Sequence, residues 1–182
     1  MVYVFLATGF EEVEALTPVD IMRRAGVECE TVSITDETIV PSSHGIGIVA
    51  DRVIGEIDFS KADMIVLPGG LPGATNLDAC ETLKQGIIQL FKDGRHLAAI
   101  CAAPLVYGHL GILEGHSATC YPGFETELKG ATYTASPVQV DEQFITGFGP
   151  AAAFEFGYTI LEELGYGDKA KALREGMMYN KL

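Results

Sequence analysis

The stretch Leu97-Ala98-Ala99-Ile100-Cys101-Ala102-Ala103-Pro104 predicts a buried strand that ends at Ile100 and a helix that Cys101 begins. Cys101 would then lie on the turn between them. Unpaired N–H groups at a helix N-terminus favour a thiolate over a thiol, so this position predicts a nucleophile. Ala99 and Ala103 are small, as the sharp turn of a nucleophile elbow requires. A cysteine after an apolar strand is also a common core residue, so the neighbouring residues must decide between the two interpretations.

Apolar strands alternate with helices on both sides of this stretch. Residues 2–7, 28–34 and 64–67 are expected strands, and a helix is expected over 76–92. An earlier helix begins either near Glu11 or with Thr17 as its N-cap. The alternation predicts an α/β fold in which helices cover both faces of a mostly parallel sheet.

Three loops fall at the carboxyl ends of predicted strands. They are residues 9–14, residues 68–73 and the turn at Cys101. Because sites in such folds form beyond the carboxyl ends of the strands, we expect these loops to build one site.

Composition limits the classes of function. The 182 residues are 48% hydrophobic, which predicts one soluble globular domain over 1–182. Lys and Arg number 12 against 25 Asp and Glu, and the net charge of −13 disfavours nucleic acids and anionic membranes as partners. The N-terminus lacks the basic start of a signal peptide, so we expect a cytoplasmic protein.

Four cysteines are far apart in the sequence: Cys29, Cys80, Cys101 and Cys120. Without a C-x-x-C pair they predict neither a zinc site nor a disulfide framework, and we expect no metal and no cofactor. Cys29 and Cys80 are interpreted as structural residues.

The loops also contain acids and glycines. Glu11, Glu12 and Glu14 follow the first strand, and a carboxyl buried beside a thiol would have a raised pKa and share its proton. The alternative is an acidic first helical turn. The glycine-rich loop 68–73 can direct backbone N–H groups into the same crevice, although it can also be only a tight turn.

No histidine adjoins Cys101, and position 102 is alanine. His96 and His109 are expected to be structural or solvated. His44 lies in a turn from which it can reach a site in a partner subunit. The missing histidine argues against a Cys-His protease or amidase.

Several motifs follow one another in a specific order along nearly the whole chain: residues 9–14, 18–20 with 23–26, 66–70, 73–77, 98–104, and 149–150 with 154–156. In this order they resemble the ThiJ/PfpI superfamily, which has a class I glutamine amidotransferase-like fold. Within it they resemble the branch of the parkinsonism-associated protein deglycase and its bacterial relatives. The resemblance implies a flavodoxin-like three-layer sandwich that forms a homodimer.

The resemblance also implies roles for individual residues. The family's reactive cysteine falls on Cys101, and its protonated glutamate falls on Glu14. Its backbone donors fall on Gly69, Gly70, Leu71 and Ala102.

The chain departs from the family at two positions. Tyr121 stands where close relatives carry a histidine, which leaves proton transfer to Glu14, Tyr121 or water. Ala102 stands where the peptidase-like members carry a histidine, which disfavours that activity. Cys120, next to Tyr121, is a further candidate at the site.

These residues leave two functions of different classes open. In one, Cys101 adds to a reactive carbonyl such as glyoxal, methylglyoxal or an early glycation adduct, and Glu14 carries the proton. In the other, Cys101 is a redox sensor that is oxidised to a sulfinate and alters a partner interaction or chaperone-like behaviour. Thiazole-phosphate metabolism, the historical association of the family name, has no identifiable site residues.

Overall fold

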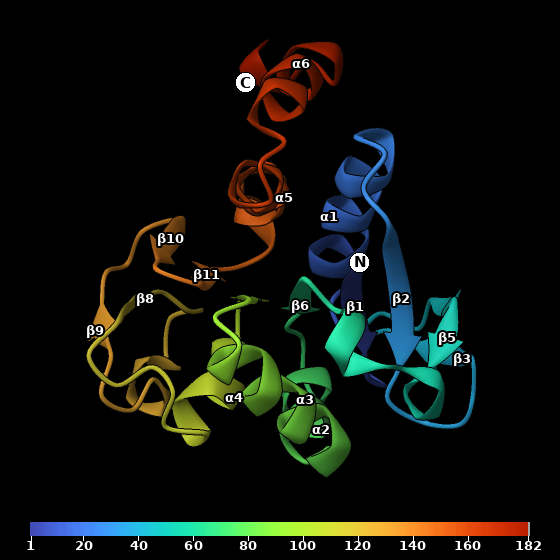
Figure 1. The fold of residues 1–182 in the computed structure, drawn as a ribbon, viewed down its shortest axis with the longest axis vertical. Helices are drawn as coiled ribbons and strands as arrows, with labels where there is room; N and C mark the ends of the chain where they lie inside the picture. The colour runs from blue at the N-terminus through green and yellow to red at the C-terminus, as the bar shows by residue number, and fades with distance from the viewer. Residues whose placement is uncertain (182) are drawn as a thin grey trace.

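A seven-stranded sheet forms the centre of the computed structural model, which describes residues 1–181. Its strand order is β10-β11-β7-β6-β1-β2-β5 (Figure 1). All neighbouring pairs are parallel except β10 with β11. The mostly parallel sheet predicted from the sequence is therefore confirmed. The strands are β1 (Val2–Leu6), β2 (Cys29–Ser33), β5 (Arg52–Val53), β6 (Met64–Leu67), β7 (His96–Ile100), β10 (Val138–Asp141) and β11 (Phe144–Gly147).

Helices on both faces of the sheet complete three layers (Figure 1). One face carries α1 (Glu12–Arg24) and α5 (Ala153–Glu163), with α6 (Gly167–Gly176) beyond α5. The other face carries α2 (Gly73–Asp78), α3 (Glu81–Lys92) and α4 (Pro104–His109). Side chains of β1 alternate between two hydrophobic clusters, as a strand buried on both faces requires: Val4 belongs to the first cluster and Phe5 to the second.

The helix boundaries differ from the predicted ones in two places. The helix expected over 76–92 is two helices, because Cys80 adopts an extended backbone between α2 and α3. The apolar spacing continues across this break, so the sequence pattern did not reveal it. The helix after β7 begins at Pro104, not at Cys101. At the first helix, the earlier of the two predicted starts is confirmed, since α1 begins at Glu12 and contains Pro18.

Smaller elements extend from the sheet. A hairpin of β3 (Ile39–Pro41) and β4 (Gly47–Val49) is held against the loop after β1 by a bridge between Phe10 and Ser42. β8 (Ser117–Ala118) and β9 (Thr132–Tyr133) form a separate parallel pair. None of the helices within residues 1–181 is both long and apolar enough to cross a membrane. The 3-10 helices are η1 (Ile54–Glu56), η2 (Phe59–Lys61), η3 (Glu125–Glu127), η4 (Pro150–Ala152) and η5 (Tyr179–Lys181).

Candidate active site

Cys101 occupies a strained backbone position at the carboxyl end of β7. Its φ of 65° lies in the left-handed region, which costs free energy for a residue with a side chain. Both of its backbone polar groups are paired: the N–H donates to the carbonyl of Gly147 at 2.9 Å, and the carbonyl accepts from Tyr121 N–H at 2.8 Å. The neighbouring segments therefore hold the sharp turn that the sequence predicted.

Glu14 lies in the first turn of α1 and is fully buried. Its Oε2 accepts a hydrogen bond from Gly69 N–H at 2.8 Å. Its Oε1 is buried without a conventional hydrogen-bond partner within residues 1–181. The Cys101 thiol interacts with this carboxyl closely enough that each group shifts the pKa of the other. Three separate predicted loops thus meet at one carboxyl group.

Gly69 packs closely against both Cys101 and the Glu14 carboxyl. A Cβ on this residue would be 2.6 Å from Cys101 Cβ and 2.8 Å from Glu14 Oε2. Real Cβ atoms essentially never approach other atoms so closely, so the site requires glycine here.

Burial raises the pKa of both reactive groups. The pKa of Glu14 rises to about 7, mainly by burial and further by the nearby Glu11 charge, although hydrogen bonds from Cys101 and Gly69 oppose the rise. The pKa of Cys101 rises to about 12, first by burial and then by the negative charge of Glu14. Burial and the Glu14 charge therefore favour the thiol, and the sequence-based expectation of a thiolate set by a helix end stays a prediction. Removing the carboxylate charge removes one cause of the raised thiol pKa, so protonation of Glu14 makes the Cys101 thiol easier to ionise.

Backbone N–H groups surround the sulfur. Hydrogen bonds from Gly70 and Ala102 lower the pKa of Cys101 and partly offset its burial. Gly70 has a φ of 83°, and a Cβ there would lie 2.5 Å from Glu11 N, so only glycine fits. Leu71 follows with an exposed side chain, and a role for its N–H stays a prediction.

Tyr121 and Cys120 have different environments. Tyr121 is half-exposed, and its ring lies against Gly149, where a Cβ would be 3.1 Å from Tyr121 Cδ2. Its N–H bond to the Cys101 carbonyl places it beside the turn. Cys120 is fully buried in the second hydrophobic cluster, whereas Cys101 belongs to the first. Burial raises the pKa of the Cys120 thiol to about 12.

His44 contacts acids of its own chain. Its Nδ1 lies 2.8 Å from Glu12 Oε2 and 3.7 Å from Glu11 Oε2. Burial opposes ionisation of Glu12, but hydrogen bonds from His44 and Ser42 lower its pKa to about 2. The donor atoms of these three ligand-type side chains lie within 4.8 Å of one another, a spacing that could hold a metal ion. The Phe10–Ser42 bridge creates this cluster, and no spacing in the sequence indicated it.

Comparisons with known proteins point to the same family that the sequence motifs resemble, and the match extends along most of the chain. The model of the DJ-1/PfpI family matches residues 1–163. Protein DJ-1 homolog B of Arabidopsis thaliana is 41% identical over 167 residues, which are 91% of this chain but only 38% of that protein. The chain thus spans less than half the length of this relative.

Two further relatives match over nearly their whole length. The Schizosaccharomyces pombe protein named glutathione-independent glyoxalase DJ-1 is 30% identical, with 97% of each chain covered. The structure of oxidized Toxoplasma gondii DJ-1 superposes with a TM-score of 0.93 at 32% identity, with 97% of each chain covered. This superposition confirms the flavodoxin-like sandwich expected from the sequence.

Proposed function

Because this chain belongs to the DJ-1/PfpI family, we propose that it is a DJ-1-type stress-response protein that converts small reactive carbonyl compounds without a cofactor. Cys101 is the nucleophile in this proposal, and Glu14 is its proton partner. The observation that carries it is the buried pair of Glu14 and Cys101 around Gly69. The glyoxalase name of the Schizosaccharomyces pombe relative supports the same class of substrate.

The first step is addition of the sulfur to an aldehyde carbon. The Glu14 carboxylate accepts the thiol proton while the S–C bond forms and the C=O π bond breaks. The proton then passes from Glu14 to the new oxyanion, which gives a hemithioacetal. The N–H groups of Gly70 and Ala102 stabilise negative charge at the sulfur as the thiol ionises.

A 2-oxoaldehyde allows the reaction to finish without an external oxidant. Glu14 removes the proton from the former aldehyde carbon, and the hydroxyl proton passes to the adjacent carbonyl oxygen, which gives an enediolate. Glu14 then returns its proton to the carbon that carried this carbonyl, and a C=O bond forms next to the sulfur. The product is a thioester of a 2-hydroxy acid. Water then cleaves the thioester, releases the acid and restores the thiol. A carboxyl with a pKa of about 7 can give and take this proton near neutral pH.

Loss of methylglyoxal, measured with wild type and Cys101→Ala, tests the proposal. We expect no conversion above background in the variant. Cys80→Ala is the matched control, because Cys80 is a free and only partly buried cysteine at the start of α3. Equal rates for Cys101→Ala and wild type would exclude catalysis by this sulfur.

Redox sensing is the second candidate, and the same N–H groups favour it. A sulfinate on Cys101 would be stabilised by the donors at Gly70 and Ala102 and by a protonated Glu14. After mild peroxide treatment, mass spectrometry should show two added oxygens on Cys101 before any on Cys29 or Cys80. Oxidation of those two cysteines beside an unmodified Cys101 would exclude the sensor.

We further propose a cytoplasmic homodimer whose interface includes the β3–β4 hairpin. Exposed apolar side chains gather there on Ile39, Ile46 and Val49, and Val13 of α1 is also exposed. Sedimentation of wild type and Val49→Glu tests the interface, with a shift of the variant toward monomer expected. An unchanged dimer would place the interface elsewhere.

A further inference from the structure

His109, the last residue of α4, lies between two acids of other elements. Its Nδ1 is 2.9 Å from Asp78 Oδ2 at the end of α2, and its Nε2 is 2.8 Å from Glu127 Oε2 in η3. The sequence predicted only a structural or solvated histidine here, because both acids are far from it in the chain. Folding therefore gives each ring nitrogen a carboxylate partner.

The two contacts require a proton on each ring nitrogen. A neutral imidazole has one N–H group, and ionised carboxylates have no proton to donate, so only the imidazolium can donate to both acids. Hydrogen bonds to Glu127 and Asp78 raise the pKa of His109 above its ordinary value of 6.5. The Asp78 charge adds to this rise, whereas burial and the nearby Lys129 charge oppose it. The imidazolium is thus the form that fits this position.

The Asp78 carboxylate depends on this histidine. Within residues 1–181, Asp78 Oδ1 is buried without a hydrogen-bond partner, and His109 is the partner of Oδ2. A neutral imidazole that donates to Glu127 turns a lone pair toward Asp78 and leaves that carboxylate without a donor. One that donates to Asp78 turns its lone pair toward Glu127 instead. Loss of the proton therefore breaks one of the two contacts.

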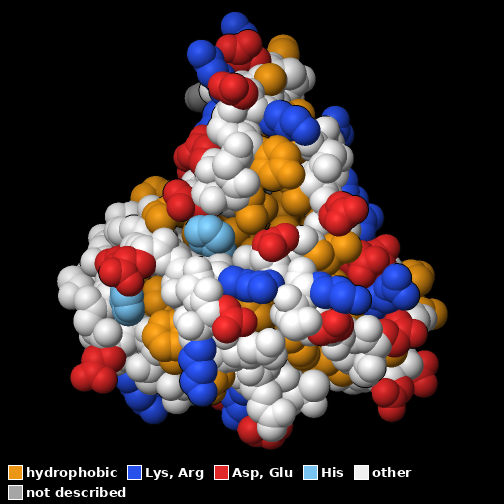
Figure 2. Space-filling view, in the orientation of Figure 1, with side chains coloured by type: hydrophobic (Ala, Val, Ile, Leu, Met, Phe, Trp, Pro, Cys, Tyr) orange, Lys and Arg blue, Asp and Glu red, His pale blue; other side chains and the backbone are white. Residues whose placement is uncertain are grey.

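The paired contacts distinguish His109 from the other three histidines. Within residues 1–181, His44 and His116 contact carboxylates through Nδ1 alone, and His96 has no carboxylate contact. Acids are numerous over the chain, but Lys and Arg side chains lie among them on the face shown in Figure 2. A general excess of negative charge acts on all four histidines, so the double contact is what sets His109 apart.

Glu127 belongs to a segment, residues 121–128, that reaches from the Cys101 turn to α4. At its start, Tyr121 N–H donates to the Cys101 carbonyl at 2.8 Å. At its end, η3 packs so closely on α4 that a Cβ on Gly108 would overlap the Glu127 carbonyl oxygen. Residues 121–127 between these ends are exposed or half-buried. The contacts at the two ends therefore decide how firmly the segment is held.

We propose that protonated His109 is a pH-sensitive clasp that holds residues 121–128 against α2 and α4. The imidazolium pairs with Asp78 and Glu127 at once, which ties η3 to both helices. As the pH rises and the imidazolium loses its proton to solvent, one carboxylate faces a ring lone pair and the segment loosens. Because Tyr121 begins the segment, loosening reaches the backbone beside Cys101. The clasp operates whether or not Cys101 is catalytic.

Hydrogen exchange of backbone amides, measured at pH values below and above the titration of His109, tests the clasp. The imidazole C–H resonances locate that titration. The reporters are the amides of Tyr121, Phe124, Glu127 and Leu128, which donate backbone hydrogen bonds. After correction for intrinsic exchange at each pH, their protection should fall by about two- to fivefold above the titration, the range for one partly exposed ion pair. Equal protection on both sides would overturn the proposal.

His109→Gln removes the titrating group. The reporter amides of this variant should show the lower protection at both pH values, and an unchanged spectral dispersion would show that it folds. His116→Gln is the matched control, because His116 contacts Asp141 and neither acid of the clasp. The control should keep the pH dependence of wild type. A pH-dependent protection that survives in His109→Gln would overturn the proposal.

Glu127→Gln tests the ion pair while the histidine stays in place. Since the variant loses one of the two negative charges, the His109 resonances should titrate at a lower pH than in wild type. Glu125→Gln is the control, because Glu125 lies in the same 3-10 helix but accepts from Gly123 N–H instead. It should leave the His109 titration where it is. An unchanged His109 titration in Glu127→Gln would also overturn the clasp.

Discussion

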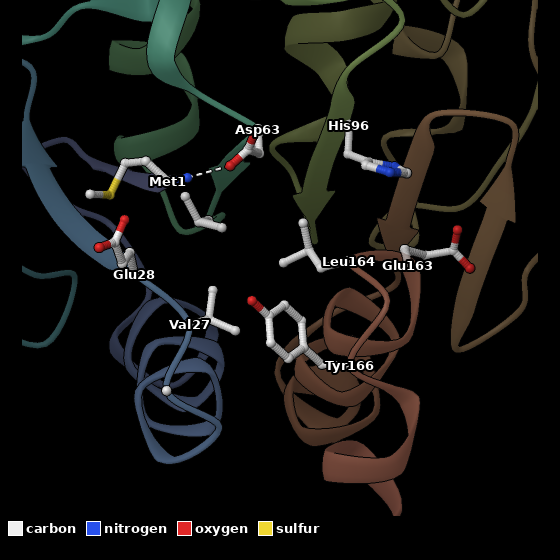
Figure 3. A pocket seen from close by; sticks show the side chains of 10 residues that line it. Met1, Val27, Glu28, Asp63, His96, Glu163, Leu164 and Tyr166 are labelled. Atoms are coloured by element: carbon white, nitrogen blue, oxygen red, sulfur yellow. Dashed lines mark hydrogen bonds and ion pairs between the residues drawn. The ribbon is translucent and has the colours of Figure 1, made fainter.

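Acidic side chains at the two edges of the sheet differ in burial. At the carboxyl edge, Glu14 is fully buried, and a Cβ on neighbouring Gly69 would be only 2.6 Å from Cys101 Cβ. At the opposite edge, the amino edge, where β1, β6 and β7 begin, Glu28 and Glu163 line a cavity of about 450 Å³ (Figure 3). Burial raises the pKa of Glu14 to about 7, which suits this carboxyl to proton transfer, whereas the acids at the other edge are not enclosed by the protein.

The largest effect should appear when the buried acid at the carboxyl edge is neutralised. Glu14→Gln should lower kcat/KM for methylglyoxal by about 10²–10⁴-fold, the usual contribution of a general acid or base. The amide cannot accept the Cys101 proton, while its volume stays the same. Steady-state kinetics measure the loss, and Glu37→Gln serves as the control acid. A Glu14→Gln variant within twofold of wild type would remove Glu14 from the mechanism.

Tight packing at the carboxyl edge predicts the next largest effect. Gly69→Ala forces a Cβ to within 2.9 Å of the Ile100 carbonyl oxygen and into the reactive pair. We expect activity to fall by at least about tenfold and the free energy of unfolding to fall by about 1–3 kcal/mol. Denaturant unfolding and kinetics measure the two losses. Gly55→Ala is the matched control, since no atom lies within 4 Å of a Cβ there.

The buried acid also predicts a pH dependence. Because the carboxylate form of Glu14 accepts the thiol proton, kcat/KM should fall about tenfold per unit as the pH falls below the Glu14 pKa of about 7. A profile that is flat between pH 5 and 8 would contradict this assignment.

The raised pKa of Glu14 also makes stability depend on pH, but stability should fall as the pH rises, whereas activity should increase. The folded-state pKa lies above the ordinary value of 4.5, so the folded protein binds the proton more tightly than the unfolded chain. This contribution is fully present below pH 4.5 and is lost as the pH rises through about 7. Unfolding measured across that range should show the loss in wild type and not in Glu14→Gln.

The smallest effect is expected at Tyr121. Tyr121 contacts the Cys101 turn through its backbone N–H, and its ring is half-exposed. Tyr121→Phe should therefore keep kcat/KM within about threefold, since exposed side chains away from the reacting atoms contribute little. A loss above tenfold would instead give the phenol hydroxyl a role in proton transfer.

Sequence patterns predicted which loops form the site more fully than they predicted the pKa values of its side chains. The apolar strand before Cys101 and the glycine-rich loop after β6 indicated which loops meet, because parallel strands place their carboxyl ends at one edge. The break at Cys80 was missed, since hydrophobic spacing does not record a single extended residue. The cavity at the amino edge was also missed, because its acids come from segments far apart in the chain.

The sequence by itself determined the α/β class, the position of Cys101 after its strand and the presence of several glutamates in a loop at the same edge of the sheet. Local residue order fixes these features through hydrophobic periodicity and turn chemistry. Tertiary structure alone decided which acid becomes the proton partner. It buries Glu14 against Gly69, pairs Glu12 with His44 and leaves Glu28 and Glu163 at an open cavity. Desolvation and partner distance set a pKa, and both depend on segments brought together only by folding.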